Sequence, residues 1–409
     1  MPTLLQINPV LRRTTSTGRI MQEIGELAIA KGWDSFIAYG KGRDGIAPCR
    51  SRTIPVGSKL DVALHAVATR LFDAHGLASK IATRRFIRKV RQIDPDVIHI
   101  HNIHGYFLNY KILFDYLAKS GKPVIWTVHD CWLFTGHCYH YASAGCYRWK
   151  THCGHCPQKG AFPASLLADR SGKNFDDKKK AFNSVRNLTI VPVSEWMKNE
   201  MKDSFLKDHR FEVIRNGIDL SVFKPTDDSA VRRKHGLGSW QVILGVASIW
   251  SREKGIDDFI SLASELSGGQ VIVLVGKMSS ENISRLPENI VHIDRTDDVA
   301  ELSALYSSAL ALVNPTWQDN YPTVNLESIA CGTPVITYRT GGSIEAITEE
   351  TGFVVDQGDV KAIYDRIRLL ADADGNVWRG HCREHALAHF SKEDRYQEYI
   401  TLYEDLATR

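Results

Sequence analysis

Short apolar runs alternate with stretches of helical spacing along most of the chain, and this alternation limits the fold more than any other feature. In the first half, such runs begin at Leu4, Val97 and Val124. The pattern returns in the second half, between Val242 and Tyr338. Strands that are separated by helices form parallel sheets, because each helix provides the crossover to the next strand. The sequence therefore predicts an α/β fold with two doubly wound, Rossmann-like parallel-sheet domains that face each other across a cleft.

Length supports two domains, because a chain of 409 residues exceeds one typical core. A largely polar stretch at 217–240 separates the two halves. A cleft between two such domains is the usual place for a ligand. We expect a first domain at 1–218 with a cysteine- and histidine-rich insert at about 131–177, a second domain at 219–388, and a terminal helix at 389–409.

Charge and hydropathy exclude several classes of protein. The formal net charge of +4 is too small to indicate a nucleic-acid-binding protein. No apolar run approaches the roughly 20 residues of a membrane span. The first residues lack the basic region and apolar core of a signal peptide. We therefore expect a cytoplasmic protein whose eight cysteines are thiols or metal ligands.

The stretch 314–327 has the composition of a ligand site. The apolar run 309–313 predicts a buried strand, and helical spacing begins near Pro322, which fits a first helical turn. Asp319 lies in the loop between them. The free N–H groups of a helix start favour anions, above all phosphate, and Glu327, one turn into the helix, can accept hydrogen bonds from a ribose diol. The alternative is an ordinary strand–loop–helix unit with two surface carboxylates.

A second group of residues could neutralise a diphosphate. Arg252 and Lys254 follow the strand predicted at 242–247 and precede a helix. Cations at that place can bind phosphate oxygens. The alternative is an ordinary exposed pair of basic residues, and only the combination with the helix start near Pro322 makes the pair informative.

Polar residues also follow the predicted strands of the first half. His101, Asn102 and His104 follow one strand, and His129 follows another. Ligands of open α/β sheets bind at the carboxyl ends of the strands, where a histidine can bind a sugar hydroxyl or transfer a proton. The alternative is that these histidines are structural. Gly18, in a polar loop after the first strand, could let a ligand approach the backbone, or it could be a plain loop glycine.

Four of the five cysteines in the insert have the spacing Cys138-x7-Cys146-x6-Cys153-x2-Cys156. Four thiolates can form a closed tetrahedral zinc site, and Cys-x2-Cys is a familiar ligand spacing. The alternatives are reduced cysteines packed in a loop, or disulfides. A catalytic metal is not expected here, because four thiolates would leave no open coordination position.

The stretch 70–91 is strongly basic, with apolar residues at roughly helical spacing. A basic amphipathic helix can bind an anionic membrane surface. The alternative is a solvated helix that covers a sheet with its apolar face.

The chain resembles the retaining glycosyltransferases of the GT-B fold, in the family usually numbered four. The resemblance covers most of the chain, and the cysteine-rich insert resembles a subgroup among bacterial polysaccharide-assembly enzymes. The motifs that carry it are Val213-Ile214-Arg215-Asn216-Gly217-Ile218-Asp219, Glu253-Lys254-Gly255, Asn320-Tyr321-Pro322-Thr323-Val324-x-x-Glu327, Ala330-Cys331-Gly332-Thr333-Pro334-Val335 and Gly341-Gly342-x-x-Glu345.

The resemblance implies that the second domain binds a UDP- or GDP-sugar and the first domain binds the acceptor. It implies that Lys254 and its basic neighbour hold the diphosphate, that Glu327 binds the ribose, and that Asp319 and His129 lie near the transferred sugar. It also implies that Gly18 lies against the phosphates of the donor and that the final helix crosses back onto the first domain. The donor-binding residues would be Gly18, Arg252, Lys254, Asn320, Tyr321, Pro322, Thr323, Val324 and Glu327.

The sequence departs from the family pattern in three places, one of which is the N-terminal loop, with one glycine where many members have two. Asp319 is one methylene shorter than the usual glutamate, and Ile249 occupies the place of a usual arginine, for which Arg252 could substitute. We predict a hexosyltransferase with no catalytic metal, which transfers sugar to a glycan or lipid-linked acceptor in bacterial surface polysaccharide synthesis. It would be cytoplasmic or peripheral on the inner face of the membrane. A sugar-nucleotide 2-epimerase and a non-catalytic sugar-nucleotide-binding protein are the alternatives.

Overall fold

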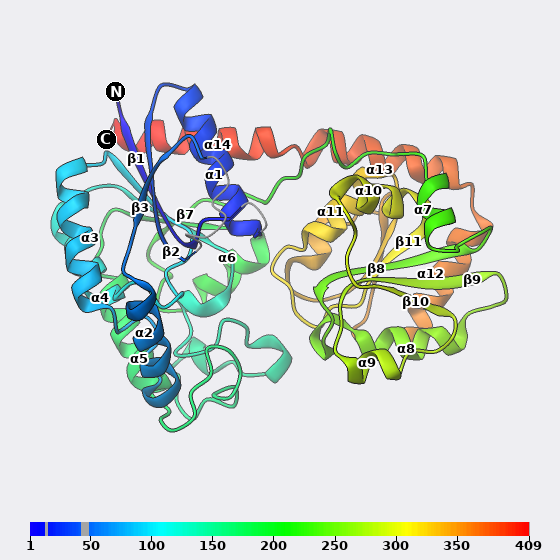
Figure 1. The fold of residues 1–409 in the computed structure, drawn as a ribbon, viewed down its shortest axis with the longest axis horizontal. Coiled ribbons are helices and arrows are strands. Elements are labelled where there is room, and N and C mark those ends of the chain that lie inside the picture. The colour runs from blue at the N-terminus through cyan, green and yellow to red at the C-terminus, as the bar shows by residue number, and fades with distance from the viewer. Residues whose placement is uncertain (13–14, 42–48, 409) are drawn as a thin grey trace. The chain divides into compact units, whose positions relative to one another are not determined.

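The computed structural model divides the chain into two compact units, each a parallel sheet covered by helices (Figure 1). One unit comprises Met1–Ile214 together with Tyr396–Arg409, and the other comprises Arg215–Arg395. The predicted pair of Rossmann-like parallel sheets is confirmed. The structure describes residues 1–12, 15–41 and 49–408.

The first unit contains a seven-stranded sheet in the order β3-β2-β1-β4-β5-β6-β7, and every neighbouring pair is parallel. All residues of β4, β5 and β6 are buried, as expected where helices cover both faces of a sheet. The strands are β1 (Thr3–Val10), β2 (Asp34–Lys41), β3 (Arg52–Pro55), β4 (Val97–Ile100), β5 (Val124–Val128), β6 (Leu188–Pro192) and β7 (Arg210–Phe211).

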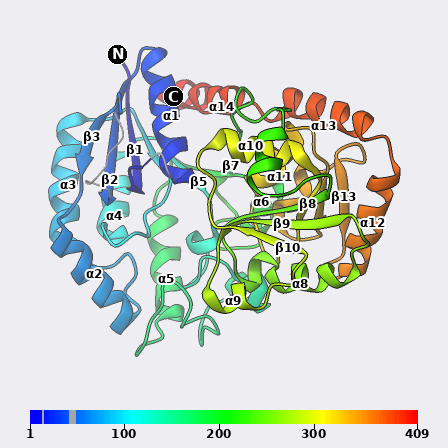
Figure 2. The ribbon, with the colours of Figure 1, turned by 45° about the vertical axis from the view of Figure 1, so that its right-hand side comes forward.

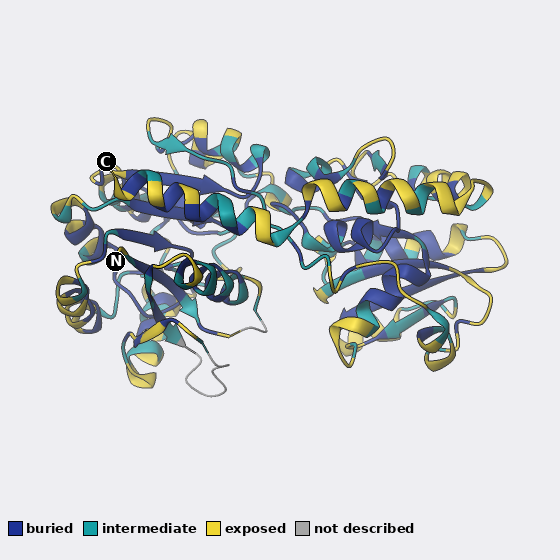
Figure 3. Cartoon of the chain, turned by 90° about the horizontal axis from the view of Figure 1, so that it is seen from above, coloured by how far each residue is buried: buried dark blue, intermediate teal, exposed yellow. Residues whose placement is uncertain are grey.

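Adjacent residues of these strands belong to two different cores, because side chains alternate between the faces of a sheet. Leu5 and Ile98 pack in one core, whereas Leu4 and Val97 pack in the other. Figure 2 shows helices beside the sheet. In Figure 3, which is coloured by burial, the strands inside are dark blue and the outward helix faces are yellow. The helices are α1 (Ser16–Ala30), α2 (Lys59–Phe72), α3 (Lys80–Ile93), α4 (Tyr110–Ser120), α5 (Ser171–Phe182) and α6 (Glu195–Lys202), with 3-10 turns η1 (Cys131–Leu133), η2 (Ala142–Ala144) and η3 (Arg148–Lys150) in the insert.

The basic stretch 70–91 is not one helix. α2 ends at Phe72, and its C-cap residue Asp73 has a left-handed φ of 49°. Gly76 has a φ of 72°, so the chain turns before α3 begins. On α3 the apolar Phe86, Ile87 and neighbouring residues are buried, while the basic side chains are exposed. The apolar face of α3 thus covers the sheet.

The last helix, α14 (Lys392–Ala407), begins in the second unit and ends in the first. Tyr399, Ile400 and Tyr403 pack in the same core as Leu4. The Tyr403 hydroxyl lies 2.6 Å from Nδ1 of His99, inside the sheet. The C-terminal turns are therefore part of the first unit's core.

The second unit contains a six-stranded sheet in the order β10-β9-β8-β11-β12-β13, again with parallel neighbours throughout. Its strands are β8 (Gln241–Ile249), β9 (Gln270–Lys277), β10 (Ile290–Ile293), β11 (Ala309–Asn314), β12 (Val335–Tyr338) and β13 (Gly352–Val355). Its helices are α7 (Ser229–Lys234), α8 (Ile256–Glu265), α9 (Ser280–Ser284), α10 (Val299–Ser308), α11 (Thr323–Ala330), α12 (Val360–Asp372) and α13 (Gly375–His389), with 3-10 turns η4 (Arg252–Lys254) and η5 (Gly341–Ala346).

The polar stretch at 217–240 belongs to the second unit rather than forming an open linker. Within it, the short helix α7 is held by Arg232, which donates hydrogen bonds to the carbonyl oxygens of Gly238, Trp240 and Ser308. All three acceptors are backbone carbonyl oxygens. Contacts of this kind produce no hydrophobic pattern from which the sequence could have predicted them.

Both sheets reverse their strand order next to their first strand. The reversal falls between β1 and β4 in the first unit and between β8 and β11 in the second. Open α/β sheets bind ligands at the carboxyl ends of the strands that flank such a point. The loops after β1, β4, β8 and β11, together with the neighbouring loops after β5 and β12, are therefore the places to look for a site.

Candidate functional site

In the second unit, the loops that follow β8, β11 and β12 are joined by backbone hydrogen bonds. The amide of Trp317 donates to the carbonyl oxygen of Glu253 at 2.9 Å, and the amide of Gly342 donates to that of Asp319 at 3.1 Å. The Thr340 hydroxyl donates to the Trp317 carbonyl at 3.1 Å. Three loops from adjacent strands thus form one polar surface at the carboxyl edge of the sheet.

A salt bridge joins two of these loops. Nζ of Lys254 lies 2.6 Å from Oδ2 of Asp319, and the two side chains are 37% and 19% exposed. Gly255 follows Lys254 with a φ of 77°, and a Cβ there would lie 2.4 Å from the carbonyl oxygen of Pro315. The glycine therefore allows the two loops to approach each other closely. Arg252 is exposed in the same turn.

Glu327 is buried and oriented by a tyrosine. Only 8% of Glu327 is exposed, although it lies in the second turn of α11. The Tyr306 hydroxyl donates to Oε2 of Glu327 at 2.9 Å. Burial, followed by the Glu327 charge, raises the pKa of Tyr306 well above its usual value, so Tyr306 acts as a donor. A buried, oriented carboxylate can bind a diol with two hydrogen bonds.

A network of buried amides fixes the start of α11. Nδ2 of Asn314 donates to Oδ1 of Asn325 at 2.8 Å, and Nδ2 of Asn325 donates to the carbonyl of Ser343 at 3.0 Å. Pro322 is the N-cap residue, and no side chain caps the helix. The Asn325 amide donates to the Pro322 carbonyl oxygen at 3.2 Å. Among the contacts that the described residues make, this leaves the N–H groups of Thr323 and Val324 for an anion.

The other predicted donor residues lie around the same helix start. Asn320 and Tyr321 are buried, whereas Thr323 and Val324 are partly exposed. Burial raises the pKa of Tyr321 to about 12, so its hydroxyl remains protonated. The structure thus brings Arg252, Lys254, Asp319, Asn320, Tyr321, Pro322, Thr323, Val324 and Glu327 to one edge of the second unit's sheet.

In the first unit, three histidines adjoin each other at the ends of β4 and β5: His99 and His101 are fully buried, and His129 is partly exposed. The rings of His99 and His101 have centroids 4.0 Å apart, and those of His101 and His129 are stacked at 5.8 Å. Nε2 of His101 lies 3.0 Å from Oε1 of Gln6. Burial lowers the pKa of His99 to about 3 and that of His129 to about 4, and it lowers the pKa of His101 well below 6.5. At neutral pH these imidazoles are uncharged.

The loop after β4 is tied to the loop after β5 by an ion pair. Nε2 of His104 lies 3.0 Å from Oδ2 of Asp130. Burial acts to raise the pKa of Asp130, but His104 lowers it below its usual value. The carboxylate also accepts a hydrogen bond from the amide of Trp132, which starts η1. Asn102 is half-buried in the same loop.

Gly18 does not lie in a loop. It occupies the first turn of α1, and a Cβ there would lie 2.4 Å from the carbonyl oxygen of Arg12. The glycine is therefore required by the chain's own backbone. Its predicted contact with donor phosphates stays a prediction.

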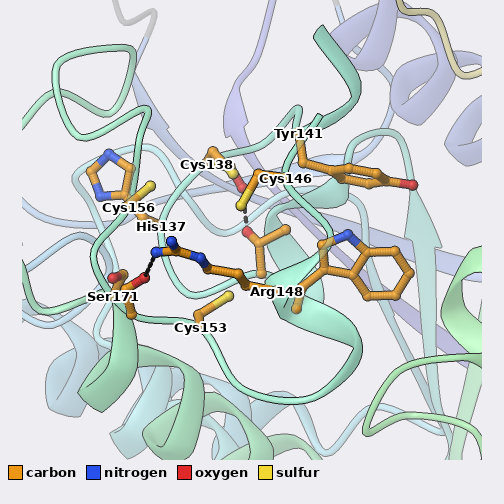
Figure 4. A pocket seen from close by; sticks show the side chains of 11 residues that line it. His137, Cys138, Tyr141, Cys146, Arg148, Cys153, Cys156 and Ser171 are labelled. Carbon is orange, nitrogen blue, oxygen red and sulfur yellow. Dashed lines mark hydrogen bonds between the residues drawn. The ribbon is translucent and has the colours of Figure 1, made fainter. Parts of the chain in front are cut away.

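Four of the five cysteines in the insert line one small cavity together with His137 (Figure 4). Among residues 1–12, 15–41 and 49–408, no three cysteine, histidine or acidic side chains lie together as a formed metal site. In the same part of the chain, no helix is both long and apolar enough to cross a membrane.

Sequence reasoning did not identify several residues of the second unit's site. Tyr306 orients Glu327, and Asn325 joins α11 to β11 and η5. Arg215 and Glu345, both within the resemblance motifs, form a salt bridge of 3.1 Å that the sequence did not predict. A buried amide inside a helix, such as Asn325, was the one signal that could have indicated such a network.

Two family models match the chain. One, described as glycosyltransferase family 4, matches residues 18–222, half of the chain. The other, described as glycosyl transferases group 1, matches residues 241–373.

A relative from Escherichia coli K12, "Putative colanic acid biosynthesis glycosyl transferase WcaC", is 26% identical over 98% of this chain and all of its own length. Among solved structures, the sucrose-phosphate synthase of Thermosynechococcus elongatus has a TM-score of 0.74 at 19% identity, covering 99% of both chains. Anabaena HepE, solved in complex with UDP, has a TM-score of 0.70 at 14% identity, covering 99% of this chain and all of its own.

The two parallel sheets, together with these likenesses, define a glycosyltransferase of the GT-B fold. More specifically, the chain belongs to glycosyltransferase family 4.

Proposed function

We propose that this enzyme is a retaining glycosyltransferase that moves a hexose from a UDP- or GDP-sugar to a saccharide or lipid-linked acceptor in bacterial surface polysaccharide synthesis. The observation that carries the proposal is the Lys254–Asp319 salt bridge beside the uncapped start of α11, whose second turn bears Glu327. Relatives named for colanic acid and capsular polysaccharide biosynthesis support the polysaccharide assignment.

The charge at the edge of the sheet suits a leaving diphosphate. As the bond between the anomeric carbon and the β-phosphate oxygen breaks, the nucleoside diphosphate keeps the electron pair. Lys254, Arg252 and the N–H groups at the start of α11 stabilise that charge. Because these groups are cationic or polarised, the proposal needs no divalent metal.

The same phosphate provides a route for retention. The acceptor oxygen attacks the face that the phosphate leaves, and its proton passes to a phosphate oxygen. The new glycosidic bond then has the configuration of the donor. Glu327 holds the ribose, and Asp319 orients hydroxyls of the transferred sugar. A corresponding role for His129 of the first unit stays a prediction from the resemblance.

The first unit supplies the acceptor side in this proposal. His101 and His129 are uncharged at neutral pH because burial lowers the pKa of each. A neutral imidazole suits a hydrogen bond with a sugar hydroxyl better than one with phosphate, and this role fits the partly exposed His129. His101 is fully buried with its Nε2 next to Gln6, so it would act by positioning His129, against which it stacks. Asn102 and the His104–Asp130 pair add polar groups at the same strand ends.

A lipid-linked acceptor would bring the first unit to a membrane, and α2 and α3 provide a suitable surface. Leu60, Leu64 and Val67 of α2 are 68%, 60% and 53% exposed, although their spacing is that of a core-facing stripe. Leu166 and Leu167 are also exposed, and the Leu166 amide donates to the last turn of α2.

Cations lie next to this apolar stripe. The exposed basic residues of α3 are Lys80, Arg84, Arg85, Arg88, Lys89 and Arg91. His65 of α2 lies 2.9 Å from Ser79, the N-cap residue of α3, so the two helices adjoin. An apolar stripe beside a basic helix face fits an anionic bilayer, and we place the enzyme peripherally on the inner face of the cytoplasmic membrane.

Product analysis with a panel of UDP- and GDP-sugars tests the function. The proposal predicts transfer to a glycan or lipid-linked acceptor, with the donor's anomeric configuration in the product. Conversion of the donor alone to an epimer would indicate a 2-epimerase. Binding without any turnover would indicate a sugar-nucleotide-binding protein.

A further inference from the structure

The insert between β5 and α5 encloses a cavity of about 20 Å³, room for one small ion. Four cysteines line it, and two of them belong to the Cys153-x2-Cys156 turn (Figure 4). Cys138 and Cys156 are near enough for one thiol to hydrogen-bond the other. All four are free thiols. The fold has thus gathered cysteines that the sequence spreads over 138–156.

A buried histidine in the cavity wall is a second, independent sign of a ligand. His137 is 2% exposed, and its Nδ1 lies 2.7 Å from Oδ1 of Asp73. Its Nε2 is buried and has no hydrogen-bond partner among the described residues. An unpaired polar atom costs free energy in a buried place. A thiolate or an ion in the cavity would provide the missing partner.

Backbone groups already support two of the sulfurs. The Gly136 amide donates to Sγ of Cys153 at 3.2 Å, and the Gln158 amide donates to Cys156. Nη1 of Arg148 donates to the carbonyl oxygens of Gly154 and His155 at 2.6 and 2.7 Å, which holds the turn between the two cysteines. Such outer contacts orient metal-binding thiolates.

The surroundings also fit a negatively charged centre. Lys178 is fully enclosed, and its Nζ donates to the carbonyl oxygens of Trp132 and Thr135 at 2.7 and 2.9 Å. Thr135 is itself a cavity residue. Four thiolates around one divalent zinc carry a net charge of −2. Burial lowers the pKa of Lys178 to about 7, whereas the charges of Cys153 and Cys138 raise it, so thiolates in the cavity favour the charged form of this lysine.

We propose that the insert binds one structural Zn²⁺ through the thiolates of Cys138, Cys146, Cys153 and Cys156, with His137 Nε2–H donating to a ligand sulfur. Because the described thiols do not yet lie at coordination distances, they draw together around the ion. Zinc would fix the insert, which continues directly from His129 and Asp130. The proposal is independent of the transfer reaction, since it concerns metal content alone.

Metal analysis of the full chain, purified without chelator, tests this site. We expect one zinc per chain by elemental analysis. After removal of zinc under reducing conditions, added Co²⁺ should give the visible absorption of a tetrahedral thiolate complex. Cys146→Ser and Cys153→Ser should each lose most of the zinc and the absorption. Cys49→Ser, which changes a cysteine outside the insert, should keep both.

Two results would overturn the proposal, and both come from the wild-type chain, so they do not depend on variants that fold. One is a chain that carries no zinc and gives no tetrahedral Co²⁺ spectrum. The other is a denatured, unreduced chain with four fewer free thiols than its eight cysteines, which would show disulfides. His137→Gln should retain zinc. Loss of zinc in that variant, with retention in Cys146→Ser, would contradict the four-thiolate ligand set.

Discussion

Lys254 and Asp319 form a 2.6 Å salt bridge across 65 residues of sequence, between the loops that follow two adjacent strands. The two side chains pair with each other in this structure, although each is proposed to contact the sugar-nucleotide donor. Donor binding would therefore exchange the carboxylate at Lys254 for a diphosphate, which carries more charge. The pair keeps the ammonium in place before the donor arrives.

Replacing Asp319 should separate binding from transfer. In Asp319→Asn the amide no longer pairs with Lys254 as an anion, so affinity for a nucleoside diphosphate should be unchanged or higher. Transfer should fall by roughly 10²–10³-fold, because a group that orients the sugar is lost. Calorimetry and initial rates measure the two effects. Equal losses of affinity and rate would show that Asp319 contributes to binding of the nucleoside diphosphate rather than to orientation of the transferred sugar.

Glu327 and Tyr306 should differ in the size of their effects. Glu327→Gln removes the charge that binds the diol, and a charged hydrogen bond contributes about 1.5–3 kcal/mol, so donor KM should rise roughly 10- to 100-fold. Tyr306→Phe leaves the carboxylate but loses its orienting bond, so KM should rise only a few-fold. A larger effect from Tyr306→Phe would contradict the proposed roles.

Acid should destabilise the first unit before carboxylates titrate. His99 and His129 have folded pKa values of about 3 and 4, below the usual 6.5. Below pH 6.5 the unfolded chain binds protons that the folded chain does not, so stability falls as the pH drops from about 6.5 toward 4. The melting temperature measured across this range should show the loss. His129→Asn should make the curve shallower, and an unchanged curve would count against a neutral His129.

Membrane binding should depend on both apolar and basic residues. Leu60→Ser with Leu64→Ser should weaken binding to phosphatidylglycerol vesicles at least tenfold, because each buried methylene contributes about 0.8 kcal/mol. Arg84→Ala with Arg88→Ala should weaken it by a similar factor, since each cation contributes about 1 kcal/mol. Vesicle sedimentation measures the binding.

The control for that experiment is Leu387→Ser, which changes a leucine of α13 that is 54% exposed in the second unit. It should bind vesicles like the wild type. Equal binding to neutral phosphatidylcholine and anionic vesicles would contradict a role for the basic face of α3. Wild-type protein that stays in the supernatant with both would contradict the membrane assignment.

The sheets were predictable because strands such as β5 and β6 are buried on both faces and read as largely apolar runs, each with a single threonine. The start of α11 was predictable for a similar reason, since Pro322 and the helical spacing after it are local signals. The apolar stripe of α2 was not assigned to a surface, because Leu60, Leu64 and Val67 have the spacing of a core-facing helix. Only the fold shows that this stripe faces outward.

Contacts between segments that lie far apart in the chain could not be predicted from the sequence. The bond from Tyr306 to Glu327 depends on how α10 packs beside α11, and the bridge from Arg215 to Glu345 spans 130 positions. The place of Gly18 was mistaken because the start of α1 has no acidic residue in its first turn and no capping side chain. Without those signals, the polar segment before it resembles a loop.

Calorimetric titration of the wild type and Lys254→Ala with UDP and GDP tests the central claim most directly. The matched control is Lys361→Ala, an exposed lysine of α12. We predict that one nucleotide binds the wild type and Lys361→Ala alike, and that Lys254→Ala binds it at least tenfold more weakly while remaining folded. Equal affinity in all three proteins would show that Lys254 does not hold the diphosphate and would contradict the proposed donor site.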